Sequence, residues 1–91
     1  MIFVLHCKVE PGQSGRLPEF REAHRAHAMS GLVRILGAGP TLSDDGGQII
    51  GGVYIIDADG RAQAQAFYDG DPYVKEGIWR MTLLERYDKR V

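Results

Sequence analysis

The sequence has few of the features that would point to a disulfide-stabilised, membrane-embedded or nucleic-acid-binding protein. Its single cysteine, Cys7, cannot form a disulfide within the chain. No apolar run approaches the roughly 20 residues that a membrane-spanning helix needs, and the N-terminus lacks the regions of a signal peptide. Eleven Lys and Arg residues stand against twelve Asp and Glu residues, and the basic residues are scattered. We therefore expect a cytoplasmic protein with no membrane and no nucleic-acid partner.

The length of 91 residues indicates one domain, residues 1–91, with a thin core. A chain this small buries only about 60 to 65% of the surface of its unfolded state. Association with a second copy is the usual remedy, and it can leave a ligand cleft near the subunit interface. We therefore expect a homodimer that binds a small molecule.

Apolar and alternating segments predict four strands, at residues 2–9, 32–38, 48–56 and 78–87. Helices are expected after the turn at 11–15 and from 57–60 onward, with Ser14 and Asp59 as their caps. The order β-α-β-β-α-β is that of an α+β, ferredoxin-like fold with an antiparallel sheet and both helices on one face. The other face needs cover, which a second copy would supply in a dimeric α+β barrel.

Two strands carry details that a structure can test. Gly51 and Gly52 interrupt the third strand, which favours a β-bulge there over close approach by a ligand. In the last strand Trp79, Met81 and Leu83 occupy alternate positions, and we expect this set to face the core.

Helical spacing places a histidine in the middle of an apolar stripe on the first helix. Positions 20, 24, 28 and 31 fall on the same side as Leu17. A buried imidazole without a partner costs about 1 to 3 kcal/mol, so His24 needs a hydrogen-bond partner. It is either a satisfied core histidine or a functional one. His27, three residues later, makes a metal-binding pair geometrically possible, but no cysteine pair accompanies it, and we expect no metal or cofactor.

An Asp-Pro pair marks the turn before the last strand. The carboxylate of Asp71 can accept hydrogen bonds from free backbone N–H groups, and Pro72 at the first helical position loses none. Helix capping alone is a sufficient explanation for this aspartate.

Several short motifs together resemble the YCII-related (YciI-like) family. They are Asp71-Pro72-Tyr73 with Gly77 a few residues later, Arg21-Glu22-Ala23-His24, the segment 36–40 (Leu-Gly-Ala-Gly-Pro), and the apolar start at Ile2. The resemblance implies the dimeric α+β barrel fold and a lyase or dehydrochlorinase activity. It also matches His24 to the proposed active-site histidine of the family. The segment from His24 to Gly39 is slightly short for the family, so His27 is the alternative.

A carboxylate that holds one nitrogen of an imidazole lets the other nitrogen accept a proton. His24 and Asp71 are therefore our candidate catalytic pair for proton abstraction from a small carbonyl compound or lactone, in an isomerase or lyase reaction. Tyr73 and the amides around Gly39 are candidate donors to a developing oxyanion. The residues expected to contact the substrate are Tyr73, Gly39, Pro40, His6, Arg21 and Trp79, with Arg80 as an alternative to Arg21.

Two other classes of protein fit the same sequence. A non-catalytic dimer that binds a small metabolite would keep Trp79, Tyr54 and the glycines but would need no titrating pair. A structural or interaction module would need only the bare face of the sheet. A coupled His24–Asp71 pair in a pocket distinguishes the enzyme from both.

Overall fold

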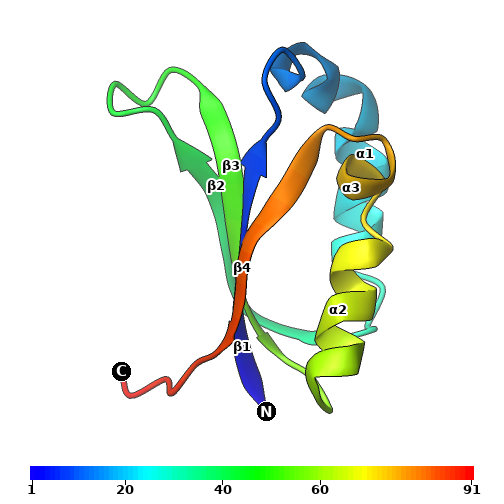
Figure 1. Ribbon diagram of the computed structural model, residues 1–91, viewed down its shortest axis with the longest axis vertical. Coiled ribbons are helices and arrows are strands. Elements are labelled where there is room, and N and C mark those ends of the chain that lie inside the picture. Colours follow the sequence, from blue (N-terminus) through cyan, green and yellow to red (C-terminus); the bar gives the residue numbers. More distant parts are fainter.

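The computed structural model describes all 91 residues as a four-stranded antiparallel sheet with its helices on one face (Figure 1). The strand order is β2-β3-β1-β4. The strands are β1 (Ile2–Val9), β2 (Arg34–Leu42), β3 (Ile49–Asp57) and β4 (Trp79–Arg86). The helices are α1 (Leu17–Ala28), α2 (Arg61–Asp69) and α3 (Pro72–Lys75), with a short 3-10 turn η1 (Ser14–Arg16) before α1. This arrangement confirms the predicted ferredoxin-like α+β fold. None of the helices is long and apolar enough to span a bilayer.

The core lies between the sheet and the helices. On β1 every second residue is buried, and these residues are Phe3, Leu5 and Cys7. They meet Ala64 and Phe67 of α2, whose pattern of two buried residues three apart is that of an amphipathic helix. Burial raises the pKa of the Cys7 thiol to about 12, so the thiol is not a nucleophile at neutral pH.

The strand β2 is longer than the sequence predicted. It was expected to end before Gly39 and Pro40, but it continues to Leu42, and Pro40 pairs with Gly52 of β3. β2 is an edge strand, so a residue without an N–H group is tolerated there. As a result, Gly39 and Pro40 lie within the sheet and not in a loop beyond it.

Both predicted helix caps were wrong. Ser14 begins η1 and makes no capping bond, because Pro18 in the first turn of α1 fixes the start of that helix farther along the chain. The cap residue of α2 is Gly60, and the Asp59 backbone N–H instead donates to the Gln63 side chain at 2.6 Å.

Gly51 and Gly52 are not themselves bulged, contrary to the prediction. They pair in regular register with Lys8 and Cys7, and the irregularity lies next to them, where Ile50 is skipped between two pairs with β2. At both glycines a neighbouring group packs so close to the β3 backbone that a side chain would not fit. A Cβ atom on Gly51 would lie 2.2 Å from the Cys7 carbonyl oxygen, and one on Gly52 would lie 2.9 Å from the Trp79 ring.

The alternation predicted for β4 changes half-way along the strand. Trp79 is buried and Met81 packs on the core as expected, but Leu84 is the buried leucine and Leu83 is not. The pairing with β1 skips Thr82, and such a bulge shifts the following side chains to the opposite face.

We predict that Gly51→Ala destabilises the fold by about 1 to 3 kcal/mol, because the added methyl group has no space beside β1. Urea-induced unfolding followed by circular dichroism measures the loss. Gly37→Ala is the matched control, because a Cβ atom at this glycine of the same sheet meets nothing within 4 Å. Equal stability of the two variants would contradict the packing argument.

Candidate active site

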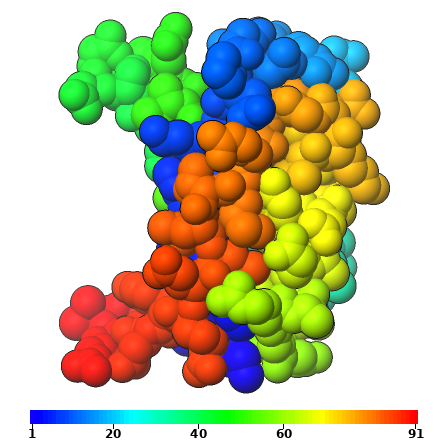
Figure 2. Space-filling model, in the orientation of Figure 1, coloured from blue at the N-terminus to red at the C-terminus, as the bar shows by residue number.

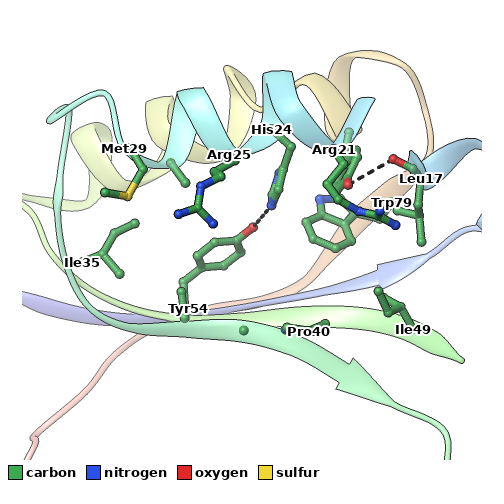
Figure 3. Close-up of a pocket in the computed structure, with 14 residues that line it drawn as sticks. Leu17, Arg21, His24, Arg25, Met29, Ile35, Pro40, Ile49, Tyr54 and Trp79 are labelled. Carbon is green, nitrogen blue, oxygen red and sulfur yellow. Dashed lines mark hydrogen bonds between the residues drawn. The ribbon is translucent and has the colours of Figure 1, made fainter. Parts of the chain in front are cut away.

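A cavity of about 500 Å³ lies between α1 and the β2–β3 side of the sheet (Figure 3). Most of its lining side chains are apolar or aromatic, and the polar ones come mainly from α1. The lining residues are Leu17, Arg21, His24, Arg25, Ala28, Met29, Ile35, Ala38, Gly39, Pro40, Ile49, Tyr54, Tyr73 and Trp79. The volume suits a ligand of about one ring, which is the low end of the usual range for small-molecule sites.

His24 lies at the centre of this cavity and has a partner on each ring nitrogen. Its Nδ1 is 2.8 Å from Oδ1 of Asp71. Its Nε2 is 3.1 Å from the hydroxyl oxygen of Tyr54 (Figure 3). An ionised carboxylate only accepts, so Nδ1 carries the proton and donates it to Asp71. In the neutral ring Nε2 then accepts from the Tyr54 hydroxyl. The result is a directed chain from Tyr54 through His24 to Asp71.

Asp71 serves as a helix cap and as the partner of His24 at the same time. Its Oδ1 accepts from the Tyr73 backbone N–H at 2.9 Å, which caps α3, and the same oxygen accepts from His24. The Asp71 side chain is only 7% exposed, against 18% for His24. The cap therefore holds the carboxylate in a fixed orientation below the imidazole.

Two aromatic rings fix the plane of the His24 imidazole. Tyr73 stacks on it with ring centroids 4.1 Å apart, and Trp79 meets it edge-on at 5.1 Å. The Tyr73 hydroxyl donates to the Leu17 carbonyl at 3.2 Å, so its hydrogen is not directed at a ligand. The phenol next to the Nε2 atom of His24 belongs instead to Tyr54. The sequence did not single out Tyr54 as a catalytic group.

Burial raises the pKa of Tyr54, and the nearby charge of Asp71 raises it further. Burial also raises the pKa of Tyr73, where the Arg21 guanidinium opposes the shift. Both phenols are therefore protonated at neutral pH. Tyr54 is suited to donate a hydrogen bond and not to act as a phenolate base.

The other predicted contact residues divide into two groups. Arg21, Gly39, Pro40 and Trp79 line the cavity. His6 does not, because it lies on the face of β1 opposite the helices, where it hydrogen-bonds Thr82 of β4. Arg80, the alternative to Arg21, is also outside, where its Nε donates to Glu10 at 2.6 Å.

His27 points away from the cavity. Its Nε2 donates to the Phe67 carbonyl at 2.7 Å, and its ring stacks on Phe67. A Cβ atom at Gly70 would lie 2.8 Å from this ring, so the glycine makes room for it. The two histidines therefore have separate partners, and no group of three His, Cys, Asp or Glu residues is arranged to hold a metal ion.

Comparison with known proteins identifies the family. A sequence model of the YCII-related domain matches residues 1–87. The chain belongs to the YCII-related family. Among curated proteins, no match was found.

Two solved structures also match the chain. The chain is similar to 5-chloro-2-hydroxyhydroquinone dehydrochlorinase (TftG) from Burkholderia phenoliruptrix AC1100, solved as a complex with 2,5-dihydroxybenzoquinone. The TM-score is 0.85 and the identity 27%, over 97% of this chain and 94% of that one. A NIPSNAP domain protein from Burkholderia xenovorans matches with a TM-score of 0.49 and 12% identity, over 97% of this chain and 95% of that one.

Proposed function

We propose that the protein is a small-molecule enzyme in which His24 and Asp71 transfer a proton. The observation that carries this proposal is the chain of hydrogen bonds from Tyr54 through His24 to Asp71 inside a ring-sized cavity. Asp71 fixes the tautomer of His24 and stabilises the imidazolium that forms when Nε2 takes a proton. Neither role needs a cofactor.

Tyr54 supplies the donor for the oxygen of the substrate. Its hydroxyl hydrogen points to His24 Nε2, and rotation about the C–O bond would turn it toward the oxygen of a bound substrate. That rotation leaves the Nε2 lone pair free to accept a proton from the substrate. A phenol with a raised pKa stays protonated while it stabilises the negative charge that develops on the oxygen.

The reaction class that fits best is elimination, in which His24 removes a proton and a chloride ion leaves from the same molecule. The likeness to a dehydrochlorinase over nearly the whole chain supports this choice. Isomerisation is the related alternative, in which the proton returns to another carbon of a carbonyl compound or lactone. Both reactions need one base, one oxyanion donor and no nucleophile.

A non-catalytic role is the second candidate. Eleven of the 14 lining positions are apolar or aromatic side chains, or glycine, and the Nε2 atom of His24 already has a partner in the Tyr54 hydroxyl. A protein that only binds and releases a small molecule would use the cavity in this state. It would also keep its affinity for the ligand, without turnover, when His24 is replaced.

We further propose that two copies pack through the open faces of their sheets. The face opposite the helices carries apolar side chains on three of its four strands, β1, β3 and β4, among them Val4, Val53, Ile55 and Leu83. Figure 2 shows that the β2–β3 loop and the C-terminal residues project on this side at opposite ends, with a hollow between them. A second sheet would fill that hollow and cover the apolar residues.

We predict that His24→Gln lowers kcat/KM for chloride release by about 10²- to 10⁴-fold, the usual contribution of a general base. The first substrates to test are 5-chloro-2-hydroxyhydroquinone and related chlorinated hydroquinones. His27→Gln is the matched control, because an amide can still donate to the Phe67 carbonyl and His27 is outside the cavity. Full activity of the His24 variant would contradict the proposal.

We predict that Val53→Glu weakens the dimer at least 100-fold, because a carboxylate at the centre of the interface has no partner. Analytical ultracentrifugation measures the dissociation constant. Ala62→Glu places the same charge on the exposed side of α2 and should leave the dimer intact. A monomeric wild-type protein, or an unchanged constant for the Val53 variant, would show that this face is not the interface.

A further inference from the structure

Two arginines of α1 flank the catalytic histidine at the cavity. Arg21 and Arg25 are four residues apart, so they lie on the same side of the helix. Both line the cavity, and Figure 3 shows them on either side of His24, with Arg25 over Tyr54 and Arg21 beside Trp79. Both residues are also exposed to solvent. A ligand in the cavity is therefore within reach of both guanidinium groups.

Neither guanidinium is neutralised by a carboxylate. Arg16, Arg80 and Arg90 each form an ion pair in the structure, but Arg21 and Arg25 do not. No Asp or Glu residue lines the cavity, and the nearby Asp71 is already occupied by His24. The cavity wall therefore carries two guanidinium charges that no carboxylate pairs with, and the nearest negative charge is that of Asp71, which is bonded to His24.

We propose that the substrate is an anion, a ring-sized planar acid whose carboxylate, phenolate or enolate oxygens pair with Arg21 and Arg25. Guanidinium groups recognise such oxygens through charge-assisted and often bidentate hydrogen bonds. The remaining lining is apolar and aromatic, which suits the flat body of the same molecule. This inference rests on the proposed function, because it assigns the substrate class of that site.

The same charges also serve the proton transfer. Removal of a proton from a substrate that is already anionic places a second negative charge on it. Arg25 lies over Tyr54, so it faces the place where the Tyr54 hydroxyl would meet the developing oxyanion. A fixed positive charge there lowers the free energy of the transition state more than that of the ground state. Neutral lactones without an acidic group are correspondingly poor substrates.

Benzoate and benzamide form a probe pair of the same shape that differs in charge. Their binding to the wild-type protein is measured by NMR shifts of the cavity residues and by fluorescence of Trp79, the only tryptophan of the chain. We expect benzoate to bind at least about tenfold more tightly than benzamide, and the advantage to shrink as salt is added. Equal binding of the two probes, or no shift at the cavity with either of them at any soluble concentration, would overturn the inference.

The variants Arg21→Gln and Arg25→Gln assign the effect to the two guanidinium groups. Each should weaken benzoate binding by roughly tenfold, the loss of one charged hydrogen bond, and should leave benzamide binding unchanged. Arg34→Gln is the control, because Arg34 is exposed on β2 and does not line the cavity. Unchanged benzoate binding in both cavity variants would contradict the assignment.

The outcome of the benzoate and benzamide binding experiment does not depend on the outcome of the activity test. Selective benzoate binding together with full activity of His24→Gln would leave an anion-binding site but remove the proposed catalytic mechanism. Loss of activity in His24→Gln together with equal binding of the two probes would keep the mechanism and assign it to a neutral substrate.

Discussion

The site depends on one carboxylate oxygen, Oδ1 of Asp71, which accepts two hydrogen bonds. One comes from the backbone N–H that begins α3, and the other comes from His24 on α1. His24 and Asp71 are 47 residues apart in the chain, so the bond between them forms only when the fold is complete. Because the cap orients the carboxylate, little side-chain freedom remains to be lost when a substrate binds. The position of the His24 imidazole is therefore set before the ligand arrives.

Residues of this site are also residues of the core. Tyr54, Tyr73 and Trp79 are all nearly fully buried, and their rings surround the imidazole. The Trp79 ring of β4 packs against β3 only because Gly52 has no side chain. A small domain has a thin core, and here the cavity takes the place of part of it. The same side chains therefore stabilise the fold and line the cavity. Asp71 and His24 are connected through this packing as well as through their hydrogen bond.

Much of this arrangement could be predicted from local sequence patterns. Alternation and helical periodicity predicted the order of the elements, and an imidazole in an apolar stripe indicated that His24 needs a partner. Tyr54 could not be distinguished in this way, because an inward-facing aromatic residue of a strand has the same pattern whether or not its hydroxyl meets a histidine. The bulge at Thr82 was also missed, since its cause is the register of β4 against β1 and not the sequence of β4 alone. Likewise, His6 was expected near a ligand, but the pleat of β1 places it on the opposite face.

The most direct test of the central claim is the tautomer of His24, read from the ¹⁵N shifts of the imidazole ring by NMR at a pH where the ring is neutral. We expect a protonated Nδ1 and an unprotonated Nε2 for His24, and the opposite for His27, which donates from Nε2 to a carbonyl. In Asp71→Ala, His24 should shift toward the ordinary Nε2-protonated form while His27 stays unchanged. A protonated Nε2 on His24 in the wild-type protein would contradict the directed chain from Tyr54 to Asp71, and with it the proposed base.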